Sequence, residues 1–208
     1  MRLSAVLCSA ALLVASAAPA QEPDRDSAPS SGSAEMDRAY FAMGCFWCGE
    51  ADFEKVPGVK EVVSGYAGGT TRNPTYEQVG AGGTGHIESV SVRYDPAIIS
   101  YGELLDIFWR NVDPLDDRGQ FCDKGESYVS AIFPANAAER RAAEASLARV
   151  QQKLGEPVAT KIIAAKTFWR AEEYHQDYYK KNPVRYSFYR DGCGRDARLK
   201  ELTRRLEN

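Results

Sequence analysis

Segments typical of strands and segments typical of helices alternate along most of this 208-residue chain. β-branched or alternating apolar residues predict strands, at residues 38–43, 59–66, 87–94, 128–133 and 161–165. Helices are predicted at residues 45–55, 101–112, 136–154 and 171–180, with Ser100 capping the second and Gly155 ending the third. This alternation favours one α/β layered domain, and the length suits a single domain.

The N-terminus resembles a secretory leader. Arg2 supplies a positive start, residues 3–18 are uncharged and mostly apolar, and Ala18-Pro19-Ala20 offers a small-residue cleavage site. We therefore expect a signal peptide at 1–20, a disordered Ser- and Pro-rich linker at 21–35 and a catalytic domain at 36–208. The protein would be exported to the periplasm, with extracellular release and a membrane anchor as open alternatives.

The charge balance limits the classes of partner. The chain has 26 basic and 29 acidic residues, a net charge of −3. This argues against a nucleic-acid partner and, once the leader is removed, against stable association with anionic membranes. The glycine-rich turns at 65–69 and 80–85 match no nucleotide-binding motif. A monomer is the default expectation.

Cys45 lies where the first predicted strand gives way to a helix. A thiol at a helix N-terminus faces unpaired backbone N–H groups and the positive end of the helix dipole. Both stabilise a thiolate, which is the nucleophilic form. The next two residues, Phe46 and Trp47, are large and aromatic. The arrangement indicates a reactive sulfur beside an apolar wall.

Three further cysteines follow in the mature chain: Cys48, Cys122 and Cys193. Cys45 and Cys48 form a C-x-x-C pair. Four thiols could in principle hold zinc, but there is no second C-x-x-C and the intervening spacings are long. An oxidising compartment would permit disulfides, and one between Cys122 and Cys193 is an alternative to a redox role for both.

Several motifs recur in one order and together carry a family resemblance. They are Gly44-Cys45-Phe46-Trp47 with Glu50, Gly65-Tyr66-Ala67-Gly68-Gly69, Asn73-Pro74-Thr75-Tyr76, Thr84-Gly85-His86-Ile87-Glu88, Tyr94-Asp95-Pro96, Ile99-Ser100-Tyr101, Asp113-Pro114 and Ala171-Glu172-Glu173-Tyr174-His175-Gln176. Over residues 38 to 190 the chain closely resembles the peptide methionine sulfoxide reductase A family. The resemblance implies an α/β (α+β) two-layer plait with a mixed sheet and flanking helices.

The resemblance also implies a chemistry. Reducing a sulfoxide requires a thiolate that attacks sulfur and an acid that protonates oxygen. Cys45 would be the nucleophile and would be converted to a sulfenic acid as methionine departs. Glu88 would be the acid, with its pKa raised by desolvation. Tyr76 and Tyr128 would hydrogen-bond the sulfoxide oxygen, and Asp123 would help to orient the site.

Phe46 and Trp47 match the family's pocket for the methyl group. An apolar wall for that methyl, with donors for the oxygen, selects one sulfoxide epimer, which in this family is S. The substrate would be oxidised methionine, free or in proteins. No metal or organic cofactor is implied.

The oxidised enzyme must then be reset. The resemblance assigns this role to Cys193, in a Gly-flanked segment expected to be flexible, and predicts a Cys45–Cys193 disulfide reduced by a thioredoxin-like donor. Three departures from the common family pattern leave alternatives open. Cys48 replaces a usual glycine, Cys122 replaces a usual asparagine, and the C-terminal tail differs. Cys48 or Cys122 could resolve or relay instead.

Two other functions remain as alternatives. A thiol–disulfide exchange protein would use Cys45 and Cys48 as its redox pair, although Phe-Trp between the cysteines is unlike that class. A metal-binding module without turnover would retain metal on purification. His86 and His175 are expected to orient neighbours or to brace the fold.

Overall fold

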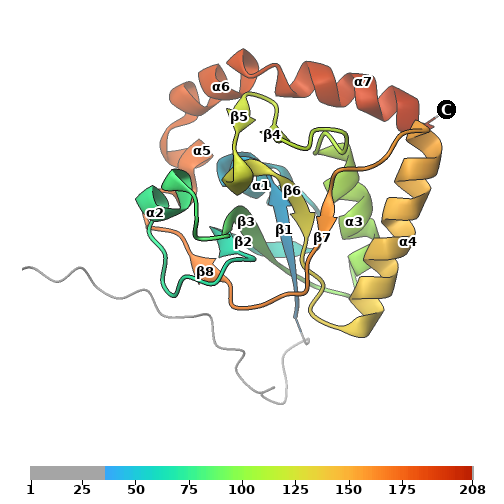
Figure 1. The fold of residues 1–208 in the computed structure, drawn as a ribbon, viewed down its shortest axis with the longest axis horizontal. Coiled ribbons are helices and arrows are strands. Elements are labelled where there is room, and N and C mark those ends of the chain that lie inside the picture. Colours follow the sequence, from blue (N-terminus) through green and yellow to red (C-terminus); the bar gives the residue numbers. More distant parts are fainter. Residues whose placement is uncertain (1–35, 208) are drawn as a thin grey trace, which may run out of the picture.

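The computed structural model describes residues 36–207, and Figure 1 shows a central sheet with helices around it. The predicted leader at 1–20 and linker at 21–35 lie outside the described residues. No helix within residues 36–207 combines the length and apolar character that crossing a membrane requires.

The central sheet has the strand order β7-β6-β1-β3-β2-β8. All neighbouring strands are antiparallel except β6 and β7, which are parallel, so the sheet is mixed as the resemblance implied. Its strands are β1 (Asp37–Met43), β2 (Val59–Ala67), β3 (Ile87–Tyr94), β6 (Ser130–Ile132), β7 (Lys161–Ile162) and β8 (Trp169–Arg170). A separate hairpin pairs β4 (Gly119–Gln120) with β5 (Asp123–Lys124).

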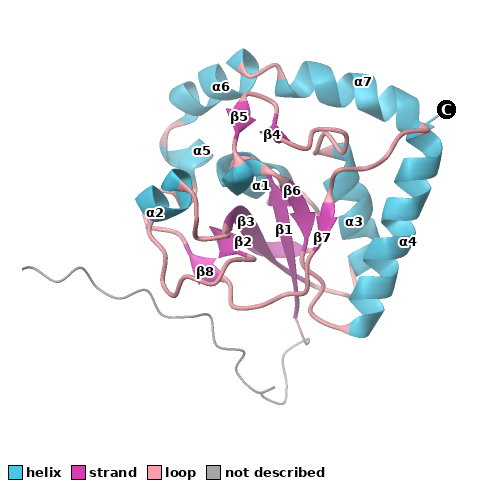
Figure 2. Cartoon of the chain, in the orientation of Figure 1, coloured by secondary structure: helices cyan, strands magenta, loops and turns pink. Residues whose placement is uncertain are grey.

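The two faces of the sheet bury different sets of side chains, because successive residues of a strand point in opposite directions. Phe41, Val90 and Tyr66 belong to the larger core cluster, which α1 (Phe46–Phe53) and α3 (Tyr101–Arg110) complete. Ala42 and Ile87 belong to a second cluster on the other face, closed by Phe168 and neighbouring residues without regular structure. The sheet is therefore central and helices flank it, with α4, α6 and α7 at the periphery (Figure 2).

Sequence signals set the ends of the two best-predicted helices. Ser100 Oγ accepts from the Glu103 N–H and forms a capping box at the start of α3. Asn136 caps α4 (Ala137–Leu154), and Gly155 ends it in the left-handed conformation at φ 68°. Both predicted helices are confirmed. α4 packs against α3 and α7 and also contacts β7, the strand at one edge of the sheet.

The structure corrects the prediction in the C-terminal third. No helix covers residues 171–177; α5 is only Tyr178–Lys181, because Asp177 takes a left-handed φ of 53°. Instead of a flexible tail, α6 (Pro183–Gly192) and α7 (Arg195–Glu207) follow, with Cys193 at their junction. Further elements that were not predicted are α2 (Tyr76–Ala81) and the 3-10 helix η1 (Glu126–Tyr128).

Candidate active site

Cys45 occupies the N-cap of α1, immediately after β1. The chain turns there through Gly44, whose φ is 79°. A Cβ atom on Gly44 would lie 2.5 Å from Gln120 Cβ, so a side chain does not fit. The Cys45 carbonyl accepts from the N–H of Cys48 at 3.1 Å, as the first turn of the helix. The cysteine is therefore at the predicted strand–helix junction, and it is only 6% exposed.

The Cys45 and Cys48 thiols form a buried pair. Burial raises the pKa of Cys45 well above its usual value, and a hydrogen bond to Cys48 raises it further. The same bond, with the charges of Arg195 and Arg190, lowers the pKa of Cys48 to about 7 against the opposing effect of burial. Cys48 is thus the more acidic thiol. The expectation that the helix N-terminus acidifies Cys45 itself is wrong, because desolvation outweighs it.

Glu88 lies beside Cys45. It belongs to β3, opposite Tyr66 of β2, and its side chain faces α1. Its Oε2 accepts from the backbone N–H of Phe46 at 3.1 Å. Burial raises the pKa of Glu88 to about 8, and the bond from Phe46 only partly offsets this. The carboxyl group therefore holds its proton at neutral pH, near the Cys45 thiol.

Tyr76 and Tyr128 approach Glu88 from two short helices, α2 and η1. Their hydroxyls hydrogen-bond each other, and that of Tyr128 also hydrogen-bonds Glu88. Burial raises the pKa of both phenols, so both remain donors. Glu172 fixes the start of α2, because its Oε1 accepts from the Tyr76 N–H at 2.9 Å.

Asp123 reaches the site through a tyrosine that the sequence did not single out. The Tyr189 hydroxyl, from α6, donates to Asp123 Oδ2 and also hydrogen-bonds the Cys45 sulfur. Burial raises the pKa of Asp123. The only available signal for Tyr189 was its position four residues before Cys193, one helical turn away.

Phe46 and Trp47 form an apolar wall. Phe46 is 2% exposed, and its ring centroid lies 4.8 Å from that of His175. Trp47 stacks on Tyr178 at 3.7 Å between centroids, and its indole N–H donates to His175 Nδ1 at 3.1 Å. Burial lowers the pKa of His175 to about 4, so the ring is neutral and can accept this bond.

His86 serves the glycine-rich turns. Its Nδ1 accepts from the Gly69 N–H at 3.2 Å, and its Nε2 lies 2.8 Å from the Thr71 carbonyl oxygen. Both histidines therefore brace neighbouring groups, as expected.

The cysteines divide into two pairs. Cys122 and Cys193 form a disulfide, with their Cα atoms 5.0 Å apart, whereas Cys45 and Cys48 remain thiols. This is the pairing that the sequence left as an alternative to Cys45–Cys193. Cys122 is exposed and precedes Asp123, and Cys193 ends α6 one turn after Tyr189. The disulfide thus joins a cysteine next to Asp123 in the sequence to a cysteine one helical turn after Tyr189.

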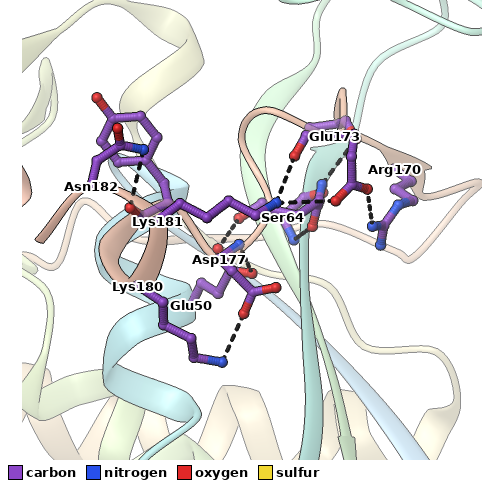
Figure 3. A network of polar contacts seen from close by, with 11 residues as sticks. Glu50, Ser64, Arg170, Glu173, Asp177, Lys180, Lys181 and Asn182 are labelled. Atoms are coloured by element: carbon purple, nitrogen blue, oxygen red, sulfur yellow. Dashed lines mark hydrogen bonds and ion pairs between the residues drawn. The ribbon is translucent and has the colours of Figure 1, made fainter.

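A buried polar network around the Glu50 carboxyl group connects α1 to β2 and to the segment after β8 (Figure 3). Glu50 accepts from the Asp177 N–H at 3.0 Å and from Ser64 Oγ at 3.1 Å. Gln176 bonds both the N–H and the carbonyl of Ser64, at 3.0 and 2.9 Å. These bonds join the helix that carries Cys45 to the segment that carries His175. Burial raises the pKa of Glu50 to about 7.

The carboxylates of Glu50, Glu54 and Asp177 are close enough to bind a cation. Lys180 already supplies one, with its Nζ 2.6 Å from Glu54 and 2.7 Å from Asp177.

Comparison with known proteins gives a consistent result. A family model described as peptide methionine sulfoxide reductase matches residues 37–206. A peptide methionine sulfoxide reductase MsrA 2 of Caulobacter vibrioides is 48% identical over 203 residues, covering 97% of this chain and 98% of the relative. An MsrA/MsrB protein of Vibrio cholerae is 50% identical over 185 residues, covering 88% of this chain but 49% of the relative. The chain thus spans about half the length of that relative.

Solved structures show the same fold. Methionine sulfoxide reductase A of Corynebacterium diphtheriae superimposes with a TM-score of 0.69 at 33% identity, covering 74% of this chain and 78% of the other. Reduced Mxr1 of Saccharomyces cerevisiae gives the same score and identity, covering 74% and 90%. Mxr1 in complex with Trx2 gives a TM-score of 0.50 at 25% identity, covering 72% and 89%.

Proposed function

This chain belongs to the peptide methionine sulfoxide reductase family, and we propose that it reduces methionine S-sulfoxide, free or in proteins, to methionine by thiol chemistry. One observation carries the proposal. The Cys45 sulfur lies within electrostatic reach of the protonated Glu88, which hydrogen-bonds the Tyr128 hydroxyl, and Tyr128 in turn hydrogen-bonds Tyr76, all beside an apolar wall. These are the nucleophile, the acid and the donors that removal of a sulfoxide oxygen requires.

In the first step Cys45 attacks the sulfoxide sulfur. Its thiol proton passes to the thiolate form of Cys48, which a pKa of about 7 makes abundant at neutral pH, while Glu88 protonates the oxygen. Tyr76 and Tyr128 donate hydrogen bonds to that oxygen as its negative charge grows. The oxygen ends on Cys45 as a sulfenic acid, and methionine leaves with the electron pair. Asp123 acts through Tyr189, which it holds against the Cys45 sulfur.

Phe46 and Trp47 receive the methyl group in this proposal. The aromatic stack of Trp47 on Tyr178 and its bond to His175 hold the indole in one orientation. Because the sulfoxide oxygen must meet the hydroxyl donors while the methyl group meets the apolar wall, only one sulfoxide epimer presents both groups correctly. We assign this preference to the S epimer, as the family resemblance implies.

Resetting the enzyme uses the other thiols. The Cys48 thiolate is the nearest nucleophile to a Cys45 sulfenic acid, and their reaction forms a disulfide and releases water. Reduced Cys193 would then attack Cys48, freeing Cys45, and Cys122 would attack Cys193 to form the Cys122–Cys193 bond. Direct attack of Cys193 on Cys45 is the shorter alternative. A thioredoxin-like protein would finally reduce the Cys122–Cys193 disulfide.

We further propose that the protein acts as a monomer after export to the periplasm. The apolar residues 3–18 and the small residues before Gln21 support export. An N-terminal residue near 21 on protein recovered from the periplasm would support this, and an intact Met1 would contradict it.

One assay tests the reductase activity. Purified protein is incubated with dithiothreitol and each epimer of a methionine sulfoxide substrate, and Cys45→Ser is the matched control. Loss of the S epimer alone, abolished by the substitution, is the expected result. Turnover of neither epimer would reject the proposal. Metal that co-purifies stoichiometrically, without turnover, would favour a binding module.

A further inference from the structure

The two most exposed large apolar side chains of the described residues lie on one helix. Val184 and Phe188, both 83% exposed, are one turn apart on α6. Gly192 follows at the same spacing of four, so the three residues share one face. We call Val184, Phe188 and Gly192 the α6 stripe. Single exposed apolar residues are common, but an aligned pair on one helix face indicates a contact surface.

The α6 stripe ends at a reactive bond. Gly192 is followed directly by Cys193, whose disulfide partner Cys122 is exposed. The catalytic pair is buried, with Cys45 6% and Cys48 1% exposed. Within residues 36–207, the Cys122–Cys193 bond is therefore the oxidised group that another protein can reach.

The backbone around Cys193 is open to a partner. A Cβ atom added to Gly192 or to Gly194 would meet no atom within 4 Å. A larger side chain at either position would project into the space through which a partner reaches the disulfide. Glycine on both sides of the cysteine leaves room for a second polypeptide to come close to the sulfur.

We propose that the α6 stripe is the docking surface for a dithiol protein reductant of the thioredoxin class. The inference rests on the proposed function, which supplies the oxidised Cys122–Cys193 pair. A partner thiolate attacks one sulfur of this disulfide and forms a mixed disulfide, releasing the other cysteine as a thiolate. The partner's second thiol then attacks the mixed disulfide. The partner leaves oxidised, and Cys122 and Cys193 are both reduced.

The occupant follows from the chemistry of the surface. A small thiol needs no apolar contact area, whereas a protein must bury some surface to hold its thiol on the bond. The Val184 and Phe188 side chains supply such area at one end of the α6 stripe. At the other end, Gly192 and Gly194 leave the backbone beside Cys193 open. The related yeast protein Mxr1 has been crystallised with Trx2, so a protein of this class can engage this fold.

The test measures reduction of the disulfide directly and needs no sulfoxide. Oxidised protein is mixed with a bacterial thioredoxin kept reduced by its reductase, and NADPH oxidation gives the second-order rate constant. Val184→Ala with Phe188→Ala should lower this constant about fivefold or more, the effect of losing about 1 kcal/mol of contact. Ile98→Ala is the matched control, because Ile98 is also exposed, at 55%, but lies outside α6. Reduction by dithiothreitol should be unchanged in every variant.

Three results would overturn the proposal. The double variant could be reduced by thioredoxin as fast as the parent, or Ile98→Ala could slow the reaction equally. Alternatively, dithiothreitol could slow in parallel, which would place the effect on the disulfide itself. A concentration-dependent dimer that the double substitution abolishes, with an unchanged thioredoxin rate, would instead assign the stripe to a second copy. Failure of the reductase activity appears separately, in the sulfoxide assay.

Discussion

The backbone N–H of Phe46 donates to Glu88 Oε2 at 3.1 Å, which places a buried carboxyl group one residue from Cys45. The bond comes from the first residue of α1, where backbone N–H groups have no helical partner. It orients the carboxyl group, and burial keeps that group protonated up to about pH 8. An acid is thus ready beside the nucleophile before substrate binds.

Glu88→Gln should lower kcat/KM by about 10²–10⁴, because the amide keeps a hydrogen bond but cannot transfer a proton. In the parent, kcat/KM should fall above about pH 8, as Glu88 loses its proton. This alkaline limb should be absent from the residual activity of the variant. A pH profile of kcat/KM from pH 6 to 10 for both proteins checks the assignment. The same alkaline limb in the variant would exclude Glu88 as its source.

Tyr128→Phe should lower kcat by about 10², since it removes a donor to the developing oxygen charge. Tyr94→Phe is the matched control, because Tyr94 is a buried tyrosine at the opposite end of β3 from Glu88. Steady-state rates with dithiothreitol separate the two. If both substitutions reduce kcat equally, the hydroxyl of Tyr128 has no specific role.

Removing individual cysteines should separate the routes of resolution. Fully reduced protein, given excess sulfoxide and no reductant, should form about two methionines per chain, one for each disulfide that four thiols can make. Cys193→Ser should form about one, through a Cys45–Cys48 bond. Methionine release in a quenched time course measures the yield, and peptide mapping identifies the bond.

Cys48→Ser should still form the first methionine per chain. Without Cys48, Cys193 must attack Cys45 directly, and a Cys45–Cys193 bond should be trapped when Cys122 is also replaced by Ser. Loss of the first methionine in Cys48→Ser would instead show that no other group can replace Cys48 as the acceptor of the Cys45 proton.

Glu50→Gln should flatten the pH dependence of stability. The pKa of Glu50 is raised to about 7 in the folded protein, so folding favours its protonated form. The associated stability is complete below about pH 4.5, the unfolded value, and is lost as pH rises to about 7. This loss should amount to about 3 kcal/mol. Urea unfolding at pH 5 and pH 8 measures it, and an equal loss in the variant would contradict the assignment.

Five of the six sheet strands, all but β8, and α1, α3 and α4 could be predicted because local patterns determine them. Alternating apolar residues mark β1 to β3, and side-chain caps at Ser100 and Asn136 mark where α3 and α4 begin. Gly155 marks where α4 ends. The proposed catalytic residues Cys45, Glu88, Tyr76 and Tyr128 came from motif resemblance, and the structure brings their side chains together.

The chain after β7 could not be predicted, because long-range contacts determine its conformation. Asp177 adopts a left-handed φ while Glu50, from the other end of the domain, accepts its N–H bond. No local pattern in residues 171–177 reports that partner. The predicted acidity of Cys45 was wrong for a related reason. The burial of Cys45 and the charges of Arg190 and Arg195, which lower the pKa of Cys48, arise from parts of the chain far apart in sequence.

Arg195 begins α7 and is 2% exposed. Its guanidinium donates to the carbonyls of Met43 at 3.3 Å and Asn111 at 2.6 Å, and lies 4.5 Å from the Phe121 ring. A protease that cut the chain between Cys193 and Arg195 would place this cysteine and this arginine on separate fragments. Loss of α7 would leave the carbonyls of Met43 and Asn111 without the Arg195 donor. α7 is thus a structural part of the candidate active site. A shortened chain that ends before residue 195 should lose its enzymatic activity.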